Sequence, residues 1–230
     1  MSAPAELLDW WERGELHLGT ALGRLTDEEF GAASLLPGWS RAQLLAHVAR
    51  NADALVNLLG WARTGVKTPM YPSPEARDEL IALTAARPPA ELRNDVLSAT
   101  RRLAGAVREM PDPAWSVEVR TAQGRTVPAA AVPWMRCREV WVHAVDLDAG
   151  VDFSDVPDDV LAALADDVFR MWDARQQVPD IAVFAGDREW GSGALAVAGT
   201  LPAVVAWLTG RSTGEGLQAD GPLPALEVWL

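Results

Sequence analysis

Apolar residues recur at a helical spacing through most of the first 150 residues, which restricts this region to helices that each bury one face. Residues 4–25 carry leucine, alanine and tryptophan about every 3.6 residues. Ser, Pro and Gly mark the ends of further helices, which we predict over 40–63, 74–86, 90–109 and 131–148. Residues 115–127 alternate around a Gly and predict a loop or small hairpin. The region is therefore expected to form a helical bundle.

The pattern changes after Gly150. The acidic stretch VDFSDVPDD predicts a linker, and Pro157 suits the first turn of a helix over 157–176. Beyond it, IAVFAGDREW is typical of a strand that enters a turn, and ALAVAGT and the terminal ALEVWL are typical of strands, whereas LPAVVAWLTGR is typical of a helix. This mixture predicts an α+β unit. We therefore expect two domains, residues 1–150 and residues 151–230.

Composition excludes several classes of function. No apolar run reaches the roughly 20 residues that cross a bilayer. The net charge of −12 disfavours nucleic acid or an anionic membrane as a partner. Cys137 is the only cysteine, so no internal disulfide can form. We expect a monomeric, cytoplasmic protein that meets any anionic ligand with locally placed arginines.

Two of the three histidines suggest a metal site. Glu139 and His143 are four residues apart and project from one helix face, with Asp146 close to them on the helical wheel. His47 lies on the apolar face of the 40–63 helix, which must turn into the bundle. Two imidazoles and one carboxylate suit a catalytic zinc. Taken singly, packed or solvated side chains explain these residues better, so spacing alone leaves the metal site open.

Other candidates for chemistry are weaker. His17 shares its helix face with no carboxylate or imidazole, which predicts a packed or solvated ring. Cys137 lies about 160° around the helix from Glu139, which predicts an inert packed thiol. No nucleophile elbow, phosphate loop or dinucleotide fingerprint is present, and the GSG at 191–193 is too short to count as one.

Four longer strings carry a resemblance to a known family. They are LPGWSRAQLLAHVARNADAL at 36–55, WARTG followed by PMY within 61–71, REVWVHAVDLDAG at 138–150 and AGTLPAVVAWLTGR at 198–211. These strings resemble the mycothiol-dependent maleylpyruvate isomerase family, and the likeness covers essentially the whole chain. It implies a DinB-like four-helix bundle followed by a small α+β domain.

The resemblance also implies a chemistry. In that family two His and one Glu hold a zinc, and they match His47, Glu139 and His143. The implied reaction is the cis–trans isomerisation of maleylpyruvate to fumarylpyruvate in gentisate degradation, with zinc and the low-molecular-weight thiol mycothiol as cofactors. A zinc-bound thiol is deprotonated, so its thiolate can add reversibly to the activated double bond.

Two alternatives share the motif. One is a mycothiol S-transferase that conjugates the thiol to an electrophile, and the other is a non-catalytic metal-binding module. The implied substrate is a small dianion, for which arginine is a suitable partner. Arg77 follows the PMY segment, near which the family pattern has an Arg at the bundle mouth, and Arg211 ends the WLTGR motif. We predict that both bind substrate, although a favourable charge at a helix C-terminus explains Arg211 as well.

Overall fold

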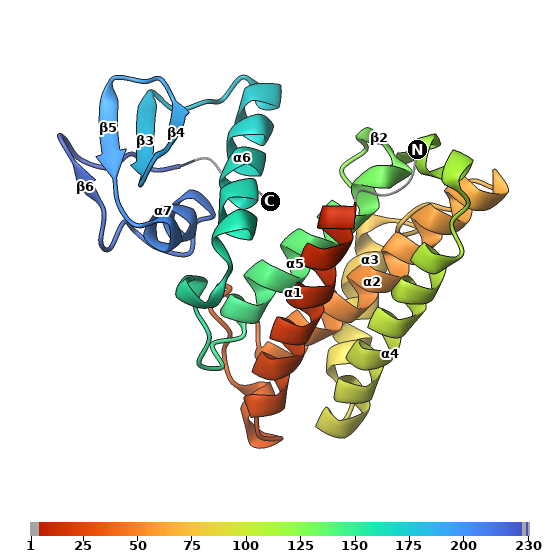
Figure 1. The fold of residues 1–230 in the computed structure, drawn as a ribbon. Coiled ribbons are helices and arrows are strands. Elements are labelled where there is room, and N and C mark those ends of the chain that lie inside the picture. Colours follow the sequence, from red (N-terminus) through yellow and green to blue (C-terminus); the bar gives the residue numbers. More distant parts are fainter. Residues whose placement is uncertain (1–4, 227–228, 230) are drawn as a thin grey trace. The chain divides into compact units, whose positions relative to one another are not determined.

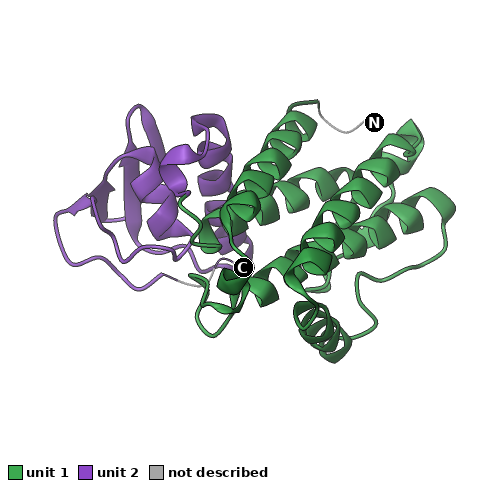
Figure 2. Ribbon diagram, turned by 90° about the horizontal axis from the view of Figure 1, so that it is seen from below, with its two compact units in different colours: residues 1–150 green, residues 151–230 purple. Residues whose placement is uncertain are grey.

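The structure, a computed structural model, describes residues 5–226 and residue 229. The chain divides into two compact units, residues 1–150 and residues 151–230, which are green and purple in Figure 2. The first unit is helical and the second contains a small sheet, which confirms the predicted fold class. No helix in the described part of the chain is long and apolar enough to cross a membrane.

Four long helices form the bundle of the first unit. They are α1 (Ala5–Arg24), α2 (Arg41–Thr64), α4 (Pro89–Arg108) and α5 (Val132–Asp146). α1 packs against α5, and α2 packs against both α4 and α5 (Figure 1). A shorter helix, α3 (Pro74–Ala85), packs along α2. Each helix predicted for this unit forms, with ends within two residues of those expected, because capping residues and prolines mark most of the boundaries.

Local signals set the ends of α2. The Ser40 hydroxyl accepts from the Gln43 N–H while Gln43 Oε1 accepts from the Ser40 N–H, which satisfies two amides at the helix start. At the other end Gly65 adopts the left-handed conformation, with φ of 74°, and its N–H bonds to the Trp61 carbonyl. These caps hold α2 in register along the bundle.

The described part of the first unit also contains a hairpin and three short 3-10 helices. The 3-10 helices are η1 (Glu28–Gly31), η2 (Asp112–Ser116) and η3 (Ala129–Ala131). The hairpin joins β1 (Glu118–Arg120) and β2 (Thr126–Pro128) in antiparallel register, and β1 packs on α2. Its turn needs a glycine, because Gly124 has φ of 80° while its N–H bonds to the Thr121 carbonyl. The predicted hairpin is confirmed.

In its described residues the second unit has a four-stranded mixed sheet and two α-helices. Its elements are η4 (Phe153–Asp155), α6 (Asp158–Arg175), β3 (Ile181–Ala185), β4 (Arg188–Gly191), β5 (Leu195–Ala198), α7 (Leu201–Leu208) and β6 (Gln218–Ala219). The strand order is β4-β3-β5-β6, with β3 and β5 parallel and the other neighbours antiparallel. α7 packs against α6 and β3.

Two predictions for this unit differ from what the described residues show. The expected linker contains an ordered turn, η4, whose Phe153 is buried and which packs against α7. Ala225, Leu226 and Trp229 of the expected strand ALEVWL lie outside any strand, and residues 227, 228 and 230 lie outside the described residues. The strand that pairs with the outer edge of β5 is β6 instead, and β4, which was expected to be part of a turn, is a further strand. Trp229 is buried and donates its indole N–H to Asp167 of α6, so this residue packs in the core without being part of a strand.

Candidate metal centre

His47 lies two turns into α2 on the face that turns into the bundle. Leu44 and Asn51, one turn to either side, are buried, and the His47 side chain is 12% exposed. The ring meets Trp39 edge-on, with 5.7 Å between centroids. The apolar stripe of α2 therefore carries an imidazole toward the interior, as the helical period predicts.

α5 supplies two side chains from one face and a third that orients them. Glu139 and His143 are one turn apart, with Oε2 of Glu139 3.3 Å from Nε2 of His143. The other ring nitrogen, Nδ1, lies 2.8 Å from Oδ2 of Asp146, whose side chain is fully buried. Asp146 therefore fixes the orientation of the His143 ring, and Nε2 is left facing Glu139.

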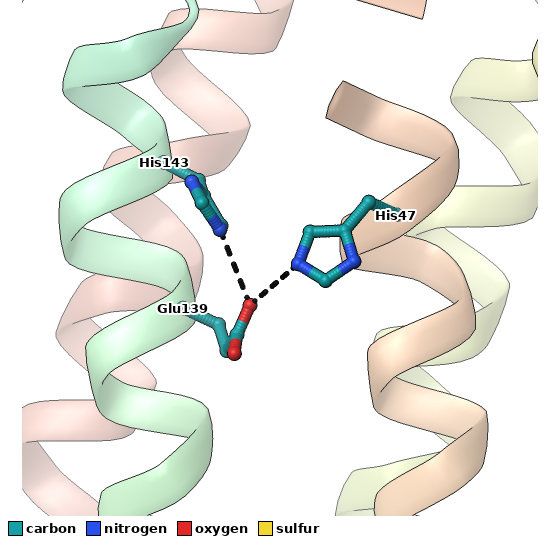
Figure 3. Close-up of side chains that lie close together, drawn as sticks. All are labelled: His47, Glu139 and His143. Atoms are coloured by element: carbon teal, nitrogen blue, oxygen red, sulfur yellow. Dashed lines mark hydrogen bonds and ion pairs between the residues drawn. The ribbon is translucent and has the colours of Figure 1, made fainter. Parts of the chain in front are cut away.

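The two helices bring three potential ligands to one point (Figure 3). His47 Nε2 lies 3.0 Å from Glu139 Oε2, and the centroids of the two imidazole rings are 5.2 Å apart. One ligand atom from each of His47, Glu139 and His143 lies within 4.8 Å of the others. Among the described residues no other group of three or more His, Cys, Asp or Glu meets this condition.

Burial and mutual contacts perturb all three groups. Burial lowers the pKa of His47 and outweighs the raising effect of Glu139. For His143, burial also acts to lower the pKa, but hydrogen bonds to Asp146 and Glu139 outweigh it and raise the pKa to about 9. Burial acts to raise the pKa of Glu139, yet the two imidazoles hold it well below its ordinary value. At neutral pH the cluster thus contains an ionised Glu139 and a protonated His143.

Arg77, at the start of α3, lies against the cluster. Its Nη2 is 3.3 Å from His47 Nδ1 and its Nη1 is 2.7 Å from Asp78 Oδ1. The guanidinium also lies 6.0 Å from the centroid of the Tyr71 ring. A guanidinium can only donate, so His47 Nδ1 accepts, and His47 Nε2 carries the proton that faces Glu139.

The remaining predicted residues lie elsewhere. Arg211 belongs to the second unit, where its Nη1 donates to the Thr209 carbonyl at 2.6 Å, just beyond α7. The Cys137 thiol is fully buried in α5. The His17 ring packs on Trp141, with 4.9 Å between centroids.

Sequence reasoning missed two polar residues of the bundle, the half-buried Tyr71 and the fully buried Arg136. Tyr71 ends the PMY segment, and burial together with Glu139 raises the pKa of its phenol to about 12, so it is a hydrogen-bond donor at neutral pH. Arg136 is fully buried one turn before Glu139 and donates to Glu15, Asn51 and the Val48 carbonyl. The three-residue spacing from Glu139 was the available signal.

Comparison with known proteins shows which family has this architecture. Residues 11–148 match the family model of the mycothiol maleylpyruvate isomerase N-terminal domain. The crystal structure of the mycothiol-dependent maleylpyruvate isomerase is 41% identical over 97% of this chain and 96% of that chain, with a TM-score of 0.92. The chain belongs to the mycothiol-dependent maleylpyruvate isomerase family. A histidine-to-alanine mutant of the isomerase matches over the same shares of each chain, at 41% identity and a TM-score of 0.91. No curated protein matches the chain.

The matches differ in which of the candidate site residues they cover. The family model of this isomerase family covers His47, Glu139 and His143, along with Arg77 and Asp146. Arg211 lies beyond it, in the part of the chain that only the solved isomerase structures cover.

Proposed function

We propose that this protein is a zinc- and mycothiol-dependent cis–trans isomerase that converts maleylpyruvate to fumarylpyruvate by reversible thiolate addition. The observation that carries the proposal is the convergence of His47, Glu139 and His143 within 4.8 Å, in a chain 41% identical to a mycothiol-dependent maleylpyruvate isomerase. A role in gentisate degradation and a cytoplasmic location belong to the same proposal.

The donor set fits zinc. Two imidazoles and one carboxylate are a ligand set that catalytic zinc sites use, and such a set leaves a coordination position for an exchangeable ligand. Asp146 holds His143 by Nδ1, which is the support that zinc-bound histidines usually have. An ion bound to His47 Nε2 would leave the ring proton on Nδ1. Nδ1 would then be a donor and could no longer accept from Arg77. His47, Glu139 and His143 would hold the ion.

The protein's own groups would bind and orient the substrate. When bound, the ion keeps the mycothiol thiol deprotonated, and that thiol supplies the nucleophile that adds and leaves. Arg77 would pair with a substrate carboxylate, and the protonated phenol of Tyr71 beside it can donate a further hydrogen bond. Arg211 is proposed as a second carboxylate partner. Cys137 is buried, so the protein offers no reactive thiol of its own.

The test is to mix zinc-loaded protein, mycothiol and maleylpyruvate and to follow absorbance alongside a thiol titration. We expect fumarylpyruvate to form while the thiol concentration stays constant, and no conversion when mycothiol is omitted. Accumulation of a conjugate would show a transferase. Tight zinc binding with no change in either substance would show a metal-binding module.

A further inference from the structure

The first unit contains a cavity next to the metal centre that the proposed function does not yet use. It has a volume of about 530 Å³. Its walls are the C-terminal end of α2 with the PMY segment that follows, the start of α3, and the turn of the β1–β2 hairpin. Arg77 lines the cavity and also reaches His47, so the cavity and the candidate metal centre share a residue.

The walls are tied together by hydrogen bonds. The Ala122 N–H of the hairpin turn donates to Met70 Sδ at 3.2 Å. The side-chain amide of Asn57, in α2, lies 3.4 Å from the carbonyls of both Pro69 and Met70. Met70 itself is buried. These contacts connect the hairpin and the PMY segment to α2, so the cavity is a feature of the folded bundle.

The lining is cationic in a strongly acidic protein. Three of its residues are Lys67, Arg77 and Arg120, and none is Asp or Glu, although the chain carries a net charge of −12. Lys67 is the only lysine in the sequence and has no hydrogen-bond or ion-pair partner within the described part of the chain. Arg120 donates Nε to the Gly124 carbonyl at 3.0 Å, a neutral partner. Two positively charged residues therefore line the cavity without an ion pair to a carboxylate in the described part of the chain.

We infer that this cavity binds the carboxylates of the substrate, with Arg77 at the metal end and with Lys67 and Arg120 as residues that select a dianion. The inference rests on the proposed function. Maleylpyruvate carries one carboxylate near the isomerising bond and another at the far end of its chain. Three cations spread along one cavity match two separated anionic groups, because each carboxylate finds a cationic donor.

The experiment uses Lys67→Gln, Arg120→Gln and the double variant, each loaded with zinc. Glutamine removes the charge but keeps an N–H donor for the Gly124 carbonyl, so the hairpin turn is preserved. Arg125→Gln is the matched control, because it removes a charge from the same hairpin at a residue that does not line the cavity. Circular dichroism and zinc content are measured for every variant.

We expect each single change to raise the KM for maleylpyruvate about two- to fivefold with kcat nearly unchanged, because exposed charge contacts contribute modestly. The double variant should raise it about five- to twentyfold. Rising ionic strength should raise the wild-type KM, and this dependence should weaken in the double variant. An unchanged KM in the double variant would overturn the inference and leave the isomerase proposal intact.

Direct binding separates this inference from the proposed function. Maleate, a non-thiol dicarboxylate, is titrated into each zinc-loaded protein and followed by nuclear magnetic resonance. We expect weaker maleate binding in the two single variants and the double variant, but not in Arg125→Gln. If maleate binding changes in this way but the wild-type protein has no isomerase activity, the result supports carboxylate binding in the cavity and rejects the proposed isomerase function. A raised KM for mycothiol with an unchanged KM for maleylpyruvate would assign the cavity to the thiol and overturn the inference.

Discussion

At the scale of single residues, the candidate site depends on three ligands from two helices. Glu139 and His143 come from one face of α5, whereas His47 comes from α2. A catalytic zinc normally has three protein ligands, so two are too few to hold it firmly.

The first prediction concerns metal content. Purified wild-type protein should contain close to one zinc per chain, and His47→Ala or Glu139→Gln should remove most of it. The matched control is His17→Ala, because His17 is the one histidine that packs away from the cluster, on Trp141. The measurement is zinc by inductively coupled plasma mass spectrometry. Stoichiometric zinc in either ligand variant would refute the assignment.

The second prediction concerns the single thiol. Cys137 is fully buried in α5, and the proposed reaction takes its thiolate from mycothiol. Cys137→Ser should therefore leave turnover within about tenfold, or roughly 1.4 kcal/mol, of wild type. Steady-state kinetics on protein with an unchanged circular dichroism spectrum checks this. A larger loss would mean that Cys137 takes part in the chemistry.

Sequence could predict contacts within one helix better than contacts between helices. The helical period placed Glu139, His143 and Asp146 together, because neighbours three or four residues apart share a face. The same period predicted that His47 lies on the apolar face of α2, which turns into the bundle. It could not show that His47 and Glu139 lie at the same height in the bundle, since that depends on how α2 packs against α5. The family resemblance supplied that step.

At the scale of elements, one buried ion pair connects all four bundle helices. Arg136 of α5 is fully buried and lies 2.7 Å from Glu15 of α1. Arg136 also donates to the Val48 carbonyl of α2, while Thr100 of α4 donates to Glu15 at 2.9 Å. A side chain fixed at this junction sets the position of α5 relative to α2, and so the distance between His47 and Glu139.

The third prediction follows from the pKa of Glu15. Burial acts to raise this pKa, but Arg136 and three hydrogen bonds lower it below its ordinary value. A depressed pKa in the folded state gives stability that is present above the unfolded-state pKa, about 4.3, and is lost as the pH falls through the folded-state pKa. Glu15→Gln should therefore be about 3 kcal/mol less stable than wild type at pH 7, because a buried Arg136 charge loses its partner.

The measurement is urea unfolding of wild type and Glu15→Gln from pH 7 down to about pH 3. The difference in free energy of unfolding should narrow as the pH falls below about 4. Glu12→Gln is the control, because Glu12 is an exposed carboxylate of the same helix. Its difference from wild type should stay near zero throughout. If the difference in free energy of unfolding between wild type and Glu15→Gln stays constant with pH, the stabilisation by this pair does not depend on ionisation of Glu15.

Element boundaries were predictable where a side chain marks them. Ser40 with Gln43 and Gly65 define α2 through hydrogen bonds that are local in sequence. The terminal ALEVWL stretch was misassigned because an apolar run is consistent with either a strand or core packing. Trp229 of this stretch is buried beside Asp167, and this long-range contact has no sequence signal.

At the scale of the whole molecule, all three candidate ligands belong to residues 1–150. The GSG at 191–193, which carried no functional motif, has a structural role in the other unit. Gly191 has φ of 71°, and a Cβ on Gly193 would lie 2.0 Å from backbone atoms of Asp180 and Ile181. Glycine is therefore required where β3 begins beside this loop.

The fourth prediction uses this glycine to perturb one unit alone. Gly193→Ala should destabilise the second unit by more than about 3 kcal/mol, because backbone atoms cannot move aside. Zinc content should stay close to one per chain. Gly186→Ala is the control, since its Cβ meets nothing within 4 Å and only its φ of 62° resists the change, at about 1 kcal/mol. Calorimetry and zinc analysis measure both, and loss of zinc in Gly193→Ala would show that the ligand cluster depends on the second unit.

The last prediction asks whether both units serve the reaction. Arg77→Ala and Arg211→Ala should each keep zinc but lose about 2–5 kcal/mol of transition-state stabilisation, as expected when one partner of a charge pair is removed. For Arg77 the contact with His47 already places a cation at the candidate centre. For Arg211 the bond to the Thr209 carbonyl favours the alternative, a charge that stabilises the end of α7.

The two roles of Arg211 give different results when kcat/KM, zinc content and melting temperature are measured together. A substrate partner lowers kcat/KM in Arg211→Ala while the melting temperature barely changes, and Arg211→Lys recovers only part of the activity because lysine cannot form two parallel hydrogen bonds to a carboxylate. A helix-end charge lowers the melting temperature and leaves kcat/KM at the wild-type value, and Arg211→Lys then restores stability in full. The second outcome would confine substrate binding to the first unit, where Arg77, Lys67 and Arg120 line one cavity.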